Sequence, residues 1–138
     1  MSLPAPVPPS SETAASSPRP SLRRRALGAY GEQVAARHLT EAGLTVLDRN
    51  WRCPLGEIDL VLREGATLVI CEVKTRVDAS HGTPHEAITP TKLERLARLA
   101  EAWQTAHEVR VADVRIDLVA VLRPPRGPAL VEHVRGLA

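Results

Sequence analysis

The residues best suited to chemistry are two carboxylates and an amine within the aliphatic segment 56–74. Asp59 and Glu72 each interrupt a run of apolar residues, and Lys74 follows Glu72 by two positions. A carboxylate in a buried strand is costly unless it is paired or binds a metal. Because oxygen ligands suit hard cations, the two carboxylates and the carbonyl of Val73 predict a site for Mg²⁺ or Mn²⁺.

This ligand set would serve hydrolysis of a phosphodiester bond. A bound ion can lower the pKa of a water molecule and neutralise charge on the scissile phosphate. Since Lys74 should stay charged beside two acids, we expect its ammonium to orient the attacking water or to stabilise the pentacovalent phosphorus. Lys74 would act as a base only if the bound metal lowers its pKa. The same residues could instead form a buried ion network without catalysis, and their spacing alone leaves both interpretations open.

Two strands joined by a tight turn must position these residues. Residues 64–67 offer a two-residue loop. If the loop is 65–66, Asp59 lies opposite Glu72; if it is 64–65, the two acids are diagonal neighbours. Because side chains alternate along a strand, both registers place the acids and the amine on one face, whereas a three-residue loop would separate them.

The rest of the chain supplies helices and further strands. Apolar spacing predicts helices over 26–42 and 89–107, the second opening with Thr89 as N-cap before a proline. Further strands are expected over 44–52, 109–122 and 129–134. The predicted fold class is α/β, a mixed sheet flanked by helices in the order α-β-β-β-α-β-β. Its first three strands form an antiparallel meander, and the second helix brings in a parallel strand.

The length of 138 residues is sufficient for one domain. Residues 1–21, rich in Pro, Ser and Ala, are expected to be a disordered tail that precedes a single domain over 22–138. The tail lacks the pattern of a secretory signal, and no apolar run is long enough to cross a bilayer, so no membrane partner is expected. Cys71 is expected to be a small core residue rather than half of a disulfide, which fits a reducing cytoplasm. Neither Cys71 nor Cys53 has a partner at zinc-ligand spacing.

Composition limits how such a protein could bind nucleic acid. The net charge is +2, and the pI is about 8.8, values that are compatible with a polyanionic partner. The aromatic residues are Tyr30, Trp51 and Trp103, and there is no phenylalanine. So few aromatic side chains argue against stacking of single-stranded bases, and any contact must rely on phosphates.

Several charged residues have two interpretations each. Glu32, within the first helix, is on its own expected to be solvated. Lys92 lies in the first turn of the second helix, where a cation opposes the helix dipole, so it is either a surface lysine or a phosphate contact. The cluster Arg23–Arg25 is expected to be solvated surface.

Two further groups could be mistaken for site residues. Asp117 interrupts the apolar strand 109–122, and pairing with Arg115 is favoured over a place in the site. His81 and His85 lie in the predicted loop after the second carboxylate strand. They lack a third ligand, so they predict a metal site only weakly.

These motifs also resemble a known family. The sequence resembles the YraN-type uncharacterised family of the restriction-endonuclease-like (PD-(D/E)XK) nuclease superfamily over nearly everything after the tail. The matching stretches are Gly28-Ala-Tyr-Gly31-Glu32-Gln-Val-Ala35, Asn50-Trp51-Arg52, Gly56-Glu57-Ile58-Asp59-Leu60, Glu72-Val73-Lys74-Thr75-Arg76 and Lys92. Arg115-Ile116-Asp117 resembles the last motif, with Ile116 where an aromatic residue is usual.

The resemblance implies a function for several of these residues. It implies a restriction-endonuclease-like fold with Asp59, Glu72 and Lys74 as the catalytic core, and Glu32 as an acid that assists metal or water binding. The motifs are also similar to those of archaeal Holliday-junction resolvases, which are dimers acting on branched DNA. DNA is therefore favoured over RNA, and a homodimer is expected.

We therefore expect an Mg²⁺- or Mn²⁺-dependent endonuclease acting on DNA, with branched or structured DNA in repair or recombination as the implied substrate. Candidate nucleic-acid contacts are Lys92, Arg76, Arg52 and Arg24. The alternatives are a nucleic-acid-binding module of the same fold that does not cut, and a scaffold whose carboxylates are structural.

Overall fold

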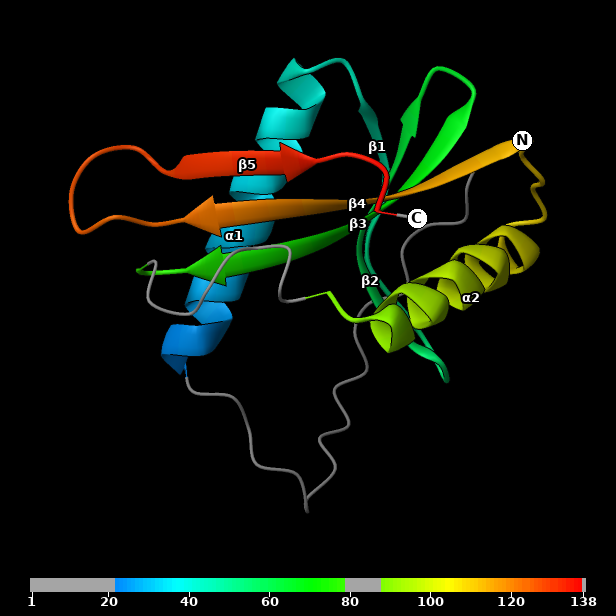
Figure 1. The fold of residues 1–138 in the computed structure, drawn as a ribbon, viewed down its shortest axis with the longest axis horizontal. Coiled ribbons are helices and arrows are strands. Elements are labelled where there is room, and N and C mark those ends of the chain that lie inside the picture. Colours follow the sequence, from blue (N-terminus) through cyan, green and yellow to red (C-terminus); the bar gives the residue numbers. More distant parts are fainter. Residues whose placement is uncertain (1–21, 79–87, 138) are drawn as a thin grey trace.

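The computed structural model describes residues 22–78 and 88–137, which form two helices and a five-stranded sheet (Figure 1). The order is α-β-β-β-α-β-β, as predicted. The elements are α1 (Leu22–Glu41), β1 (Thr45–Cys53), β2 (Gly56–Glu64), β3 (Thr67–Arg76), α2 (Pro90–Ala106), β4 (Asp113–Leu122) and β5 (Leu130–Val134).

The sheet is mixed, and its strands lie side by side in chain order, β1-β2-β3-β4-β5. β1, β2 and β3 form an antiparallel meander. β4 pairs parallel to β3, and β5 returns antiparallel to β4. The parallel pairing follows α2, which carries the chain back across the sheet, so the predicted crossover is confirmed.

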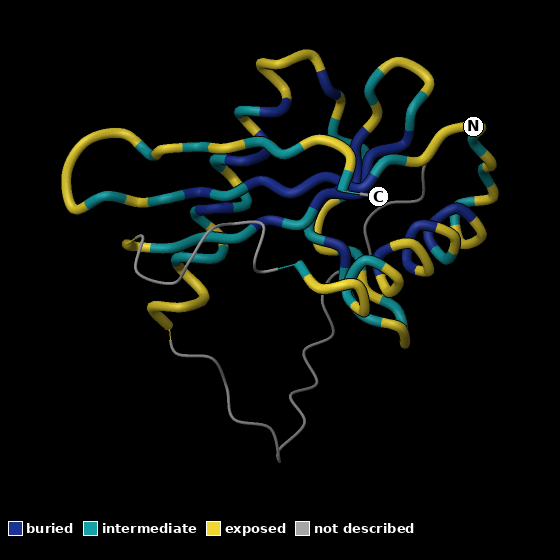
Figure 2. The backbone as a smooth tube through the Cα atoms, in the orientation of Figure 1, coloured by how far each residue is buried: buried dark blue, intermediate teal, exposed yellow. Residues whose placement is uncertain are grey.

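The two helices cover opposite faces of the sheet. Along β3, Val69, Cys71 and Val73 pack with α1, whereas the alternate residues Leu68 and Ile70 pack with α2. The central strands are therefore buried on both sides, while loops and the outer sides of the helices are exposed (Figure 2). Aliphatic runs without a polar face are typical of such strands.

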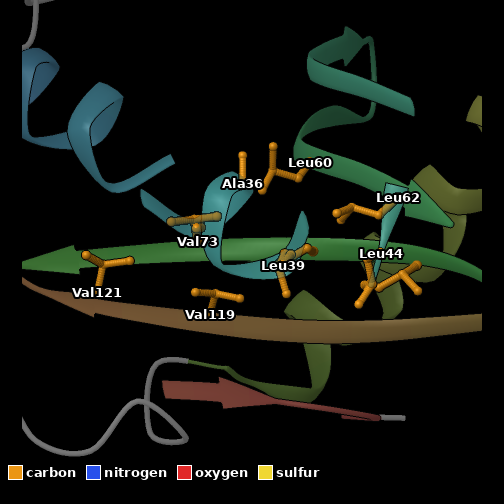
Figure 3. Packing of buried hydrophobic residues seen from close by; sticks show 11 residues of the cluster. Ala36, Leu39, Leu44, Leu60, Leu62, Val73, Val119 and Val121 are labelled. Carbon is orange, nitrogen blue, oxygen red and sulfur yellow. The ribbon is translucent and has the colours of Figure 1, made fainter. Parts of the chain in front are cut away.

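The cluster beneath α1 shows how closely this helix approaches the sheet. Ala36 and Leu39 of α1 lie against aliphatic side chains of the sheet (Figure 3). Gly31 is buried against Thr75 of β3, and a Cβ atom at position 31 would overlap Thr75 Oγ1. This close approach needs a glycine, and it fixes the neighbouring Glu32 relative to β3.

The start of α2 is as the sequence predicts. Thr89 is the N-cap, its Oγ1 accepts a hydrogen bond from the backbone N–H of Lys92 at 3.1 Å, and Pro90 is the first helical residue. The helix ends at Ala106, one residue before the predicted end.

Other element ends differ from the predictions. α1 begins at Leu22 rather than residue 26, because the leucine and arginines before Ala26 are good helix formers. Ala42, predicted to lie on the buried stripe, is exposed beyond the helix end, where Gly43 takes a positive φ of 101°.

The fourth strand begins later than predicted, at Asp113 rather than residue 109. The preceding residues turn back on α2 instead of pairing in the sheet. The Val109 N–H donates to the Gln104 carbonyl at 3.0 Å, and the Val111 N–H donates to Gln104 Oε1 at 3.1 Å. The first strand is shifted by one residue, to Thr45–Cys53, and the last strand, Leu130–Val134, starts one residue later than predicted and ends where predicted.

Some predictions concern residues outside the described ranges, namely the tail over 1–21 and the weak His81/His85 metal site. Among the described residues, Cys53 and Cys71 are both free, and Cys71 is buried in the core as expected. Within 22–78 and 88–137, no helix has the length and apolar character needed to span a membrane.

Candidate active site

The β2–β3 hairpin has the register that aligns the two acids. Pairing runs from Glu64 with Thr67 to Leu60 with Cys71, so the loop is 65–66. Gly65 has a φ of +59°, which suits a two-residue hairpin turn. The next residues along the two strands, beyond the last pair, are Asp59 and Glu72.

The sheet splits at this point, which we call the fork: the place where β2 and β3 separate after Leu60 and Cys71. Beyond it, β2 stays paired with β1 as far as Gly56, whereas β3 stays paired with β4 as far as Arg76 (Figure 1). Asp59 and Glu72 are the first residues on its two arms. The acids therefore lie at the point where backbone pairing between β2 and β3 ends.

The side chain of Asp59 bridges the fork. Asp59 Oδ2 accepts a hydrogen bond from the backbone N–H of Val73 at 2.8 Å. In a strand, the N–H and C=O of one residue point toward the same neighbouring strand, so the Val73 carbonyl also faces β2. The Asp59 carboxylate from one arm and the Val73 carbonyl from the other thus both point into the fork.

Two lysines converge on Glu72. Lys74 Nζ lies 3.6 Å from Glu72 Oε1, and Lys92 Nζ, from the first turn of α2, lies 3.2 Å from the same oxygen. The Glu72 side chain is only 13% exposed. A largely buried carboxylate therefore carries two cationic partners, one from its own strand and one from the helix on the same face of the sheet.

Glu32 reaches the site from α1. Its Oε2 accepts a hydrogen bond from Asn50 Nδ2 at 2.8 Å, and the same nitrogen lies 3.4 Å from Glu57 Oε1. Burial raises the pKa of Glu32, although the Asn50 hydrogen bond partly opposes this. Glu32 and Glu57 both act on the pKa of Asp59, so the four carboxylates share one electrostatic environment.

Asp59 has the most perturbed carboxyl group of this set. Burial, followed by repulsion from Glu72, raises its pKa to about 7, although the hydrogen bond from Val73 opposes the rise. The charged form of Asp59 thus lacks sufficient compensation from the protein alone. A divalent cation between Asp59 and Glu72 would supply that compensation.

The two lysines differ in how readily they lose a proton. Burial lowers the pKa of Lys74, and the neighbouring Lys92 lowers it further. Burial also lowers the pKa of Lys92, but its contacts with Lys74 and Glu72 outweigh this and raise it. Lys92 is therefore the more firmly charged of the two, and Lys74 the better proton acceptor.

The donor atoms at the fork fit Mg²⁺ or Mn²⁺. They are the carboxylates of Asp59 and Glu72 and the carbonyl of Val73, all oxygens. Across the described residues, no three His, Cys, Asp or Glu side chains are grouped as a metal site. A site with two carboxylates still suits Mg²⁺, which usually retains several waters and completes its shell with substrate phosphate.

The predicted nucleic-acid contacts lie at different places. Lys92 is in the site itself. Arg52 lies at its margin, 3.5 Å from Glu57 Oε2. Arg76 ends β3 two residues after Lys74, and Arg24 lies in the exposed first turns of α1.

Asp117 lies outside the site, and its predicted pairing is confirmed. Its fully buried carboxylate accepts hydrogen bonds from Arg115 at 2.8 and 2.9 Å and from the Gly136 N–H at 3.0 Å. His133 Nε2 lies 2.7 Å from the same carboxylate. Arg115 also contacts Glu64 at 2.7 Å, so this network ties β4 and β5 to the β2–β3 turn.

Sequence reasoning missed Asn50 as a contact of a site residue. The sequence held two signals, because Asn50 opens the motif Asn50-Trp51-Arg52 that matches the family and asparagine is depleted in strands. Its contact with Glu32 spans 18 positions and depends on how α1 lies on the sheet.

Comparison with known proteins identifies relatives along most of this chain. Residues 31–121 match the model of the uncharacterised protein family UPF0102. A UPF0102 protein of a Nocardioides species is 59% identical over 114 residues, which are 83% of this chain and 92% of that protein. One of Kineococcus radiotolerans is 60% identical over 114 residues, or 82% of this chain and 93% of that protein. One of Streptomyces coelicolor is 58% identical over 117 residues, 83% of this chain and 90% of that protein. The chain therefore belongs to the UPF0102 family, the YraN-type family that its motifs resemble.

Proposed function

We propose that this protein is a metal-dependent nuclease that hydrolyses phosphodiester bonds in DNA, with branched or structured DNA as its substrate. The observation that carries the proposal is the grouping at the fork of two carboxylates, Asp59 and Glu72, with two lysines, Lys74 and Lys92. The family resemblance of the motifs supports the choice of DNA and of branched substrates.

A bound Mg²⁺ or Mn²⁺ would supply a Lewis acid for the phosphate and a lowered pKa for water. Asp59 and Glu72 would hold it, with the Val73 carbonyl as a further ligand. Lys92, which keeps its charge, would contact a phosphate oxygen. Lys74, which gives up a proton more easily, would orient the attacking water and accept its proton.

A surface for the phosphate backbone continues from the fork along β3. Arg76 ends that strand, and its carbonyl accepts a hydrogen bond from the Arg123 N–H at 2.8 Å. The Arg123 guanidinium lies 5.2 Å from the Tyr30 ring of α1, and Arg126 is exposed in the β4–β5 loop. The N-terminal end of α1, with Arg23–Arg25, lies toward the same side of the molecule (Figure 1). We call this surface the arginine end.

The test is a cleavage panel of linear, flapped and four-way DNA with Mg²⁺ or Mn²⁺. We expect the wild-type protein to cut at least one of these substrates only when the metal is present. Asp59→Asn and Lys74→Ala should each reduce the rate by on the order of 100-fold or more while remaining folded.

Two outcomes would contradict the proposal. Unchanged cleavage by both folded variants would show that the fork is not the active site. Metal-independent, salt-sensitive DNA binding without cleavage of any substrate would favour the alternative, a nucleic-acid-binding module that does not cut.

A further inference from the structure

Asn50 combines an unfavourable backbone conformation with a place beside the fork. Its neighbours Arg49 and Trp51 pair with Leu60 and Ile58, so Asn50 of β1 lies opposite Asp59 of β2. Its φ is +50°, in the left-handed region that side chains other than those of Asn and Asp rarely adopt. Such conformations persist where the surrounding structure holds them, and they concentrate at functional sites.

The Asn50 side chain joins two acids from different elements. Its Nδ2 donates to Glu32 Oε2 at 2.8 Å and lies 3.4 Å from Glu57 Oε1. Because ionised carboxylates only accept hydrogen bonds, these two partners fix the NH₂ group, rather than the carbonyl, on this side. Glu32 comes from α1 and Glu57 from β2, so one amide links the helix to the arm of the fork that carries Asp59.

We infer that Asn50 is a positioning residue, whose left-handed backbone aims its amide at Glu32 and holds that carboxylate beside Asp59. This inference rests on the proposed function, because Glu32 matters only if the fork binds a cation. A neutral donor holds Glu32 without adding a further positive charge to those of Arg49 and Arg52, which already act on this carboxylate. Held in this way, Glu32 adds to the field at Asp59 and Glu72 without itself having to be a ligand.

The experiment compares Asn50→Gly with the wild-type protein. Glycine accepts the positive φ and removes the amide, so the variant should fold at least as stably as the wild type while losing the hold on Glu32. We expect it to bind Mn²⁺ about 10-fold more weakly in calorimetry, the lower end of the losses seen when a group that supports a metal site is removed, because Asn50 acts on the ion only through Glu32. Cleavage at subsaturating Mn²⁺ should fall by a similar factor and recover at higher Mn²⁺.

Two controls separate this role from a purely structural one. Glu108, the other described non-glycine residue with a positive φ, is exposed in the α2–β4 connection, and Glu108→Gly should leave Mn²⁺ affinity unchanged. In a double-mutant cycle, Asn50→Gly should weaken Mn²⁺ binding much less once Glu32 is already Gln, because Asn50 acts through Glu32.

The outcomes distinguish this inference from the proposed function. Equal Mn²⁺ affinity in wild type and Asn50→Gly, or losses that simply add in the cycle, would overturn the role of Asn50 and leave the nuclease proposal standing. A wild-type protein that binds Mn²⁺ but cuts no DNA would refute the proposed nuclease function. The comparison of Mn²⁺ affinities would still test the positioning role of Asn50. Absence of Mn²⁺ binding to the wild type would overturn both.

Discussion

Asp59 is a residue at which burial and neighbouring carboxylates disfavour the charge that metal binding requires. Its pKa of about 7 in the folded protein lies well above the value near 3.9 expected for an unfolded chain. The folded state therefore holds a proton that the unfolded state releases between these values. The stability linked to this proton is complete below about pH 4 and is lost as the pH rises through about 7.

Replacing this group should have opposite effects on stability and on activity. Asp59→Asn keeps an oxygen acceptor for the Val73 N–H but cannot ionise. When a chelator removes divalent cations, we expect the unfolding free energy of Asp59→Asn to exceed that of the wild type by on the order of 1 kcal/mol at pH 8. At pH 4 the two proteins should differ little. Urea denaturation at both pH values measures this.

Glu101→Gln, on the exposed side of α2, is the matched control and should show no such pH-dependent gain. A difference between Asp59→Asn and wild type that is equal at pH 4 and pH 8 would contradict the assigned cause. Adding Mn²⁺ should stabilise the wild type more than Asp59→Asn, because only the wild type keeps both carboxylates.

At the scale of elements, the contact between α1 and β3 determines the position of the Glu32 side chain relative to the fork. Gly31→Ala would force a methyl group into Thr75, which should destabilise the protein by about 1–3 kcal/mol and displace α1. Thermal or urea denaturation measures the loss, and Thr75→Ala in the same chain should restore part of it. Cleavage should fall as well, because Glu32 moves with the helix.

Gly28→Ala is the matched control for this prediction. Gly28 lies one turn earlier in α1, and a Cβ there meets nothing within 4 Å. Alanine should therefore stabilise the helix by about 0.5–1 kcal/mol. Equal effects of the two substitutions would show that the α1–β3 contact is not as close as described.

The network around Asp117 joins β4, β5 and the hairpin turn. Burial raises the pKa of Asp117, but hydrogen bonds from Arg115, Gly136 and His133 outweigh this and lower it below its usual value. The resulting stabilisation is present above about pH 4, near the unfolded-state value, and is lost as the pH falls through the lower folded value.

Asp117→Asn should therefore cost about 3 kcal/mol of unfolding free energy at pH 7, since it breaks the ion pair between a fully buried carboxylate and Arg115. The difference in unfolding free energy between Asp117→Asn and the wild type should become smaller below about pH 4. Asp113→Asn, at the exposed start of the same strand, should change little at either pH. DNA cleavage per folded molecule should be unaffected by Asp117→Asn, because this network lies outside the fork.

At the scale of the whole molecule, the arginine end should guide DNA to the fork. The double variant Arg123→Glu/Arg126→Glu should weaken DNA binding by on the order of 10-fold at 0.1 M salt and reduce the salt dependence of log K by about 0.9 per lost phosphate contact. Fluorescence anisotropy with labelled four-way DNA measures both. Arg110→Glu, at the opposite end of β4, is the control and should have a smaller effect.

Local patterns in the sequence were sufficient to predict much of the fold and part of the candidate site. Gly65 and the alternation of apolar residues limited the hairpin to two registers, and Thr89 with Pro90 marked the start of α2. The pattern could not choose between those registers, because the choice depends on pairing along the whole hairpin. Nor could it place Lys92 on Glu72 or Asn50 on Glu32, since both contacts arise from helices packed on opposite faces of the sheet.

The parallel pairing of β3 with β4 has a consequence for synthesis of the chain. The ribosome releases β3 before α2 and β4. The edge of β3, which carries a run of aliphatic residues, therefore stays unpaired until more than 30 further residues have been added. Unpaired apolar edges recruit other chains. A fragment that stops before β4 should therefore aggregate, although it already contains Asp59, Glu72 and Lys74.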